Sequence, residues 1–384
     1  MGNEHPARMG HPGPSVTRPS APPIYQTTAF DVPDLDVLQS LYAGVNPGDI
    51  YTRDSNPNHS ALASAIAELE GTEAGAVFAS GMGAAGSIFL SLAGSGDHVI
   101  VARSLYGKTL QLASRMRQLG VGVSQFDVSD PSQLSALLTE RTRFVLVETI
   151  SNPLLEVADL EEVVRYSGGV PVVVDSTFTT PELIRPCALG ASIVYHSASK
   201  YLNGHGDVML GVAAGTRELM QRLQETASVF GQNANPFESW LTLRGLRTLP
   251  LRMRQICETA RRLAEYLSGH AGVGRVYYPL LEGHSSRVLA ERLYSGGTGG
   301  MVSFELRGGG FEAVSGLMRR LSGIPFSPTL ADARTTISHP ATTSHRFLSA
   351  SERSSLGIAD ELIRVSVGLE PFEMLAGEFS AALV

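Results

Sequence analysis

Short apolar runs alternate with amphipathic segments along much of the chain. Seven runs have the length and composition of buried strands: 75–79, 98–102, 121–126, 143–148, 170–174, 191–195 and 208–213. Helical segments separate most of them, and this β-α alternation predicts a mostly parallel sheet covered on both faces. Ligands bind such a sheet beyond the carboxyl ends of its strands, so the residues at those ends are the candidates for function.

The flanking segments follow other patterns. Residues 1–50 are rich in Pro and Gly with one apolar segment, which predicts an extended arm that lies across another subunit. A helix is expected from Asn58 to Gly71, because Leu62, Ile66 and Leu69 fall on one face.

The C-terminal part of the chain predicts a second, smaller domain. The amphipathic stretch 237–268 leads into it, and Pro250 should kink or break that helix. Strands are expected around 273–278, 301–306 and 363–367, with helices between them. The predicted organisation is therefore an N-terminal arm over 1–50, an α/β domain over 51–245 and an α+β domain over 246–384.

Charge and cysteine content narrow the classes of partner. The formal charge is -7, from 37 acids and 30 bases. The sequence has no dense run of basic residues that could bind nucleic acid or an anionic membrane. Cys187 and Cys257 are too few for a disulfide framework, and both are expected to be buried apolar fillers. The opening residues lack the apolar segment of an export signal, and no apolar run of 18 residues follows, so a cytoplasmic location is expected.

An acid and a lysine end two of the predicted strands. Asp175 follows the run 170–174, and Lys200 lies 25 residues later, just after the run 191–195. Pyridoxal 5'-phosphate (PLP) needs this pair, since an amine bonds its aldehyde and a carboxylate keeps its ring nitrogen protonated. Either residue alone has an ordinary explanation as a turn acid or a solvated lysine. The chain, however, contains only two lysines, Lys108 and Lys200.

Residues 80–86, SGMGAAG, follow the first run and open an apolar helix, as a phosphate-binding loop would. The spacing Gly81-x-Gly83-x-x-Gly86 also fits a dinucleotide-binding fingerprint, so an NAD(P)-dependent Rossmann dehydrogenase is an alternative. That alternative requires an acid after the next strand, where Arg103 and Ser104 stand.

Several sequence blocks in order resemble one family over nearly the whole chain. They are PPIYQTTAF, YTRDSNPN, ASGMGA, ETISNPLLEVADL, VVVDSTF, HSASKYLNGHGDV, RGLRTLPLRM and LIRVSVGLE. The chain resembles the transsulfuration, or Cys/Met metabolism, enzymes of the fold-type I PLP proteins, which are aspartate aminotransferase-like. The resemblance implies PLP as cofactor, a seven-stranded, mostly parallel sheet and a smaller C-terminal domain.

The resemblance also implies roles for individual residues. Lys200 would form the Schiff base, Asp175 would pair with the ring nitrogen, and Tyr106 would stack on the ring and assist catalysis. Further cofactor contacts are implied for Gly81, Met82, Asn152, Thr177, Ser197 and Ser199, with Tyr51 and Arg53 reaching the phosphate of a neighbouring subunit. Substrate contacts are implied for Arg364, Asn152, Thr329, Lys108 and Arg334. Composite sites of this kind require at least a homodimer, and the resemblance implies a homotetramer built as a dimer of dimers.

Two positions depart from the family pattern. Lys108 stands where methionine-eliminating relatives carry Cys and cystathionine enzymes carry Gly, so it either meets a distal carboxylate or projects to solvent. Arg334 replaces a Glu associated with the distal amino group of cystathionine. The expected reaction is γ- or β-elimination or replacement on a sulfur-type amino acid, of the cystathionine γ-lyase or γ-synthase type. The alternatives within the family are methionine γ-lyase and O-acylhomoserine sulfhydrylase.

Overall fold

The computed structural model describes residues 19–383 of the protein. Its main sheet has seven strands: β1 Ala74–Phe78, β2 His98–Ala102, β3 Gly122–Phe126, β4 Thr142–Glu148, β5 Val172–Asp175, β6 Ile193–Ser197 and β7 Gly211–Gly215. They lie in the order β1-β7-β6-β5-β4-β2-β3, and β7 runs antiparallel to both of its neighbours while β2 to β6 are parallel. The prediction of a mostly parallel seven-stranded sheet is confirmed.

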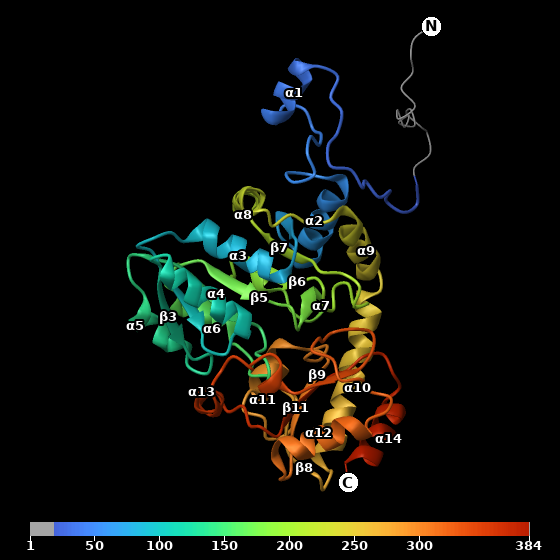
Figure 1. The fold of residues 1–384 in the computed structure, drawn as a ribbon. Helices are drawn as coiled ribbons and strands as arrows, with labels where there is room; N and C mark the ends of the chain where they lie inside the picture. The colour runs from blue at the N-terminus through green and yellow to red at the C-terminus, as the bar shows by residue number, and fades with distance from the viewer. Residues whose placement is uncertain (1–18, 384) are drawn as a thin grey trace.

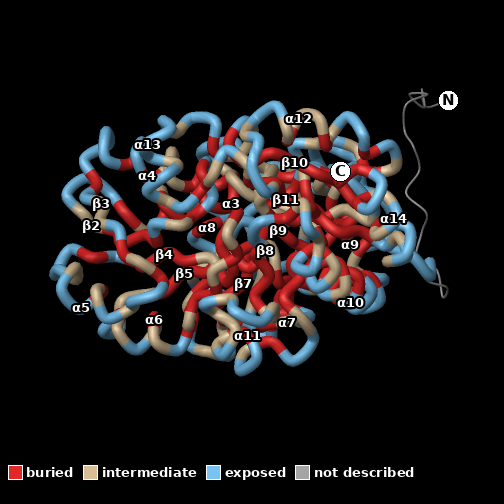
Figure 2. The backbone as a smooth tube through the Cα atoms, turned by 90° about the horizontal axis from the view of Figure 1, so that it is seen from below, coloured by how far each residue is buried: buried red, intermediate tan, exposed pale blue. Residues whose placement is uncertain are grey.

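Helices cover both faces of this sheet, since every residue of β7 and all of β5 and β6 except their last residues are buried. The connecting helices are α3 Gly81–Leu92, α4 Gly107–Gln118, α5 Leu134–Leu137, α6 Leu160–Tyr166, α7 Thr180–Leu183 and α8 Arg217–Phe230. Among them, α3 packs on β6 and β7 and touches α4 and α8 (Figure 1). Figure 2 shows that burial is concentrated along the strands, with exposed residues at the periphery.

The N-terminal segment leaves the body of the molecule. Helix α1, Leu35–Tyr42, has no buried residue and projects beyond α2 (Figure 1). Helix α2 runs over Pro57–Glu70 and ends at Gly71, as the sequence predicted. The φ of Gly71 is 70°, in the left-handed region that is common at helix ends. The predicted arm over 1–50 lies partly outside the described residues, which begin at 19.

Two helices lead to a second sheet. Helix α9 covers Pro236–Leu246 and α10 covers Leu249–Ser268, so the break lies just before Pro250, which occupies the first turn of α10. The second sheet has the order β10-β11-β9-β8, from β8 Val273–Tyr277, β9 Met301–Leu306, β10 Thr336–Ser338 and β11 Leu362–Ser366. The helices around it are α11 Arg287–Leu293, α12 Gly310–Arg320, α13 Ala350–Ser355 and α14 Phe372–Ala382. The exact domain boundaries stay a prediction.

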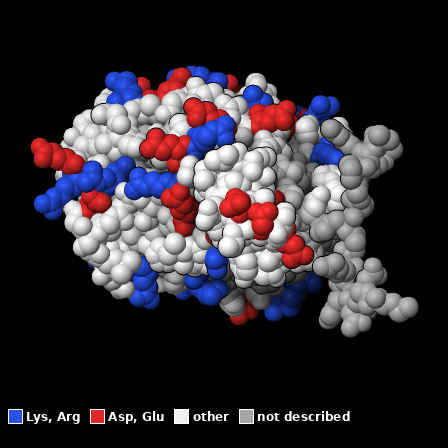
Figure 3. Space-filling view, turned by 90° about the horizontal axis from the view of Figure 1, so that it is seen from above, with Lys and Arg blue, Asp and Glu red and all other residues white. Residues whose placement is uncertain are grey.

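The distribution of charge, the burial of the two cysteines and the apolar character of the helices can be compared with what the sequence predicted. Basic and acidic side chains are interspersed on the face shown in Figure 3. Cys257 is buried, but Cys187 is only half-buried, so the expectation of two buried cysteines is wrong for Cys187. None of the helices in the described part of the chain is both long and apolar enough to cross a membrane.

Candidate active site

Asp175 and Lys200 meet at one cavity at the carboxyl edge of the main sheet. Strands β5 and β6 are parallel neighbours, with Asp175 opposite Tyr195, and Lys200 follows β6 by three residues. The cavity has a volume of about 990 Å³, and both residues line it. The expectation that two adjacent strand ends bring this acid and this lysine together agrees with the geometry.

Hydrogen bonds from one neighbour hold the Asp175 carboxylate. The Thr177 backbone N–H and hydroxyl both donate to Asp175 Oδ1, over 3.0 and 2.5 Å, and neither bonds Oδ2. The Thr177 hydroxyl also accepts the backbone N–H of Ser197 over 2.9 Å, which ties the end of β5 to the end of β6. Burial raises the pKa of Asp175, so a cation placed against Oδ2 would favour its charged form.

The start of α3 provides a cradle for an anion beside β6. The Ser80 hydroxyl caps the helix by accepting the Gly83 N–H over 2.9 Å, and the N–H groups of Gly81 and Met82 precede it at the helix start. A Cβ on Gly81 would lie 2.7 Å from Ser197 Cβ, so only glycine permits this approach. Ser199 also lines the cavity, although its hydroxyl already bonds both backbone polar groups of Leu210.

Lys200 and Arg364 place two bases over the same cavity. Lys200 Nζ donates to Thr329 Oγ1 over 3.1 Å. Burial, with the charge of Arg364, lowers the pKa of Lys200. Arg364 on β11 is 3% exposed and donates to Asn152 Oδ1 over 2.9 Å, but its Nε has no partner among the described residues. Burial lowers the pKa of Arg364 to about 10. Because Nε has no partner among the described residues, this guanidinium can take a further carboxylate.

Glu148 is a site residue that the sequence analysis missed. It ends β4, pairs in register with Asp175, and accepts the backbone N–H of Tyr106 over 2.6 Å. Burial and the charge of Asp175 raise the pKa of Glu148 well above its usual range. Its position at a strand end was a usable signal, since Glu148 is the last residue of the apolar run 143–148.

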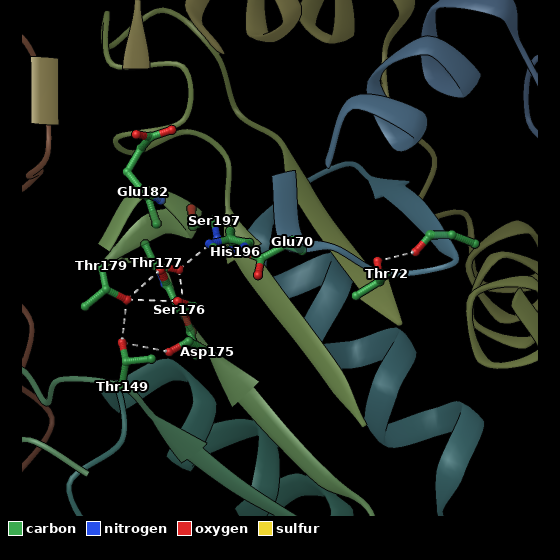
Figure 4. A network of polar contacts seen from close by, with 12 residues as sticks. Glu70, Thr72, Thr149, Asp175, Ser176, Thr177, Thr179, Glu182, His196 and Ser197 are labelled. Atoms are coloured by element: carbon green, nitrogen blue, oxygen red, sulfur yellow. Dashed lines mark hydrogen bonds and ion pairs between the residues drawn. The ribbon is translucent and has the colours of Figure 1, made fainter. Parts of the chain in front are cut away.

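A network of polar contacts surrounds the carboxyl ends of β5 and β6 (Figure 4). His196 Nε2 lies 2.7 Å from Glu70 Oε1, and both side chains are buried, which joins β6 to α2. The hydroxyl of Thr179 lies 2.9 Å from that of Thr149 and 2.8 Å from that of Ser176. These contacts fix the residues that precede Ser197 and follow Asp175.

The cavity gathers most of the expected residues but not all. Those that line it are Gly81, Met82, Tyr106, Lys108, Asn152, Asp175, Thr177, Ser197, Ser199, Lys200, Thr329 and Arg364. Tyr51, Arg53 and Arg334 do not line it. Tyr51 and Arg53 lie on the N-terminal segment, with the Arg53 guanidinium 4.8 Å from the Tyr51 ring centre. Arg334 is exposed outside the cavity, and its near neighbour Asp332 lines the cavity instead.

The chain matches a family model over residues 7–384, and the family is described as Cys/Met metabolism PLP-dependent enzymes. It is 38% identical over 369 residues to an L-methionine gamma-lyase of Fusobacterium nucleatum subsp. nucleatum, covering 94% of this chain and 93% of the relative. It is 39% identical to an O-succinylhomoserine sulfhydrylase of Pseudomonas aeruginosa, over 94% of this chain and 90% of the relative.

Solved structures agree with the sequence comparison. A cystathionine gamma synthase from Xanthomonas oryzae pv. oryzae superposes with a TM-score of 0.88 at 36% identity, over 94% of this chain and 92% of that chain. The fold-type I expectation and PLP as cofactor are thereby confirmed. The dinucleotide alternative is wrong, because the chain matches a PLP-dependent family over residues 7–384.

Proposed function

The chain belongs to the family of Cys/Met metabolism PLP-dependent enzymes, and from that premise we propose that it eliminates or replaces the γ- or β-substituent of a sulfur-type amino acid. The principal candidates are cystathionine γ-lyase and cystathionine γ-synthase. Methionine γ-lyase and O-acylhomoserine sulfhydrylase remain the alternatives within the family. The observation that carries this proposal is the convergence of Lys200, Asp175 and Arg364 on one cavity.

The residues around the cavity suit PLP. Bound PLP supplies an aldehyde for a lysine amine and a protonated ring that draws electrons from the substrate's α-carbon. Asp175 would offer Oδ2, the oxygen that Thr177 does not bond, to the ring nitrogen. The N–H groups of Gly81 and Met82, with the Ser197 hydroxyl, offer donors to the phosphate.

Lys200 is assigned the proton transfers. Its lowered pKa increases the neutral fraction of the amine, and only a neutral Nζ can accept a proton from the α-carbon. The hydrogen bond from Nζ to Thr329 Oγ1 orients the amine within the cavity. The same Nζ, once protonated, can return a proton to the substrate or to the departing group.

Arg364 and Tyr106 are assigned to substrate and ring. The guanidinium of Arg364 can hold the substrate's α-carboxylate through its unpartnered Nε, while Asn152 fixes its other edge. Tyr106 presents its ring to the cavity and can stack on the cofactor. Its phenol, whose pKa burial raises, stays protonated near neutral pH and can donate to a departing group.

The oligomer and the location are also part of the proposal. A homotetramer built as a dimer of dimers would place Tyr51 and Arg53 of one subunit at the phosphate of the next. The exposed apolar side chains of the N-terminal segment, among them Leu35 at 74% and Tyr42 at 73% exposure, suit burial against such a neighbour. The small number of cysteines suits a cytoplasmic location.

A substrate panel tests the proposed reaction. The purified holoenzyme is given L-cystathionine, L-methionine, L-homocysteine, L-cysteine and acylated L-homoserines, with and without an added thiol. Formation of ammonia and a 2-oxo acid, or of a new thioether when thiol is present, is expected from at least one of them. Absence of both products from the whole panel would contradict the proposed function.

A further inference from the structure

Two basic side chains at the cavity have no task in the proposed reaction. Lys108 and Arg346 both line the cavity, and both are exposed. Neither forms an ion pair with an acid in the part of the chain that the structure describes. Two uncompensated cations at one opening attract an anion.

The charge of Lys108 is unfavourably placed in its own helix. It lies in the first turn of α4, where the helix dipole disfavours a cation, and no acid in that turn offsets its charge. Its Nζ donates to Gln111 Oε1 over 3.0 Å, and Gln111 also lines the cavity. Lys108 therefore lies along the cavity wall, in a position where its charge is unfavourable for the helix dipole of α4.

Packing brings the segment that carries Arg346 next to the start of α4, and Arg346 lines the same cavity as Lys108. The segment around Arg346 lies directly on the start of α4, because a Cβ on Gly107 would lie 2.4 Å from the Phe347 ring and 2.9 Å from the Ser344 carbonyl oxygen. Gly107 immediately precedes Lys108 in the chain. The charge of Arg346 also acts on the neighbouring Tyr106 phenol, lowering its pKa against the larger effect of burial.

The acids of the cavity do not compensate these two bases. Glu148 and Asp175 sit at the strand ends, where Glu148 bonds the Tyr106 N–H and Asp175 bonds Thr177. Asp332 accepts the backbone N–H of Ala333 and lies against Gly206. Arg364 has its own partner in the α-carboxylate of the substrate. A second anionic group on the substrate would meet Lys108 and Arg346.

Building on the proposed function, we propose that Lys108 and Arg346 form a subsite for a second carboxylate on the substrate's departing group. The substrate is then an amino acid with a carboxylate at each end, and a planar guanidinium with an ammonium beside it binds such a group well. Two sources share this chemistry: a homoserine ester of a dicarboxylic acid, and a thioether such as cystathionine. Substrates with an uncharged end, such as methionine or an acetyl ester, leave both cations unpaired.

Matched substrate pairs test the subsite. The kcat/KM of the holoenzyme is compared for O-succinyl- against O-acetyl-L-homoserine, and for L-cystathionine against L-methionine. We expect a preference of about tenfold or more for at least one dicarboxylate, since a charge-assisted hydrogen bond contributes about that factor. Lys108→Gln and Arg346→Gln should each reduce this ratio by about tenfold, mainly through KM, and Arg346→Lys should restore part of it.

A control and a binding measurement separate the possible failures. Arg115→Gln removes a charge from the exposed face of the same helix, away from the cavity, and should leave the ratio unchanged. Binding of L-2-aminoadipate and L-norleucine, followed by the visible absorbance of the holoenzyme, should favour the dicarboxylate in the parent and lose that preference in both variants. Turnover with equal use of both members of each pair, or ratios that the variants do not alter, would overturn the subsite and leave the proposed function standing. No turnover of any substrate would overturn both.

Discussion

The backbone N–H of Tyr106 donates a 2.6 Å hydrogen bond to Oε1 of Glu148. This bond joins the start of α4 to the end of β4, one strand away from Asp175. The residue assigned to stack on the cofactor is thus held by a carboxyl that lies next to the acid assigned to the ring nitrogen. Glu148 therefore holds the backbone at Tyr106, at the start of α4.

Glu148 should make the stability of the cofactor-free protein depend on pH. Its folded pKa is raised, so its stabilising contribution is complete below the unfolded value of about 4.3 and is lost as the pH rises through the folded value. Glu148→Gln keeps an acceptor for the Tyr106 N–H but cannot ionise. Urea unfolding between pH about 5 and 8 should show a fall in unfolding free energy that is smaller in the variant by about 1 kcal/mol or more. Identical pH profiles would contradict the assignment.

Gly81 should not tolerate a side chain. An added Cβ would lie 2.7 Å from Ser197 Cβ and 2.9 Å from Ser197 Cα, and backbone cannot yield cheaply. Gly81→Ala should destabilise the protein by about 1–3 kcal/mol and weaken PLP binding, because α3 must move away from β6. The neighbouring Gly83→Ala is the matched control, since its nearest heavy atom is the Ser80 hydroxyl at 3.4 Å. Equal PLP dissociation constants for the two variants would argue against the cradle.

The proposed sharing of active sites between subunits predicts complementation between two inactive variants. In a dimer of one Lys200→Ala and one Arg53→Ala chain, one site carries both substitutions and the other carries neither. Random mixing of the two after unfolding and refolding should recover about one quarter of the parent's activity. The measurement is kcat of the mixture against each variant alone. A mixture no more active than its parts would show that Arg53 serves its own subunit.

Some of this architecture could be predicted from the sequence, and the reasons are physical. The apolar runs located all seven strands of the main sheet to within three residues, because buried strands must be apolar. The directions of the strands could not all be predicted, because nothing in the residues of β7 indicates that it runs antiparallel to β6. The three residues of β10 were too short to form a recognisable run.

Some residues of the candidate site could likewise be predicted from the sequence, and others could not. Asp175 and Lys200 could be paired because strand ends converge at one edge of a parallel sheet. Arg346 could not be found, since its place at the cavity depends on tertiary packing of its segment against Gly107. Arg334 was expected at the substrate from its alignment with a family glutamate, yet its side chain lies outside the cavity. Alignment with a family motif fixes the position in the chain, whereas the local backbone decides which side chain faces the ligand.

The central claim is that Lys200 bonds the cofactor, and borohydride reduction followed by peptide mass spectrometry tests it most directly. Reduction of the holoenzyme should bleach its visible band and leave the mass of the reduced cofactor on the one peptide that contains Lys200. The Lys200→Ala variant, treated in the same way, should carry no such mass. Finding the label on Lys108, or finding none on a protein that is coloured and active, would contradict the account.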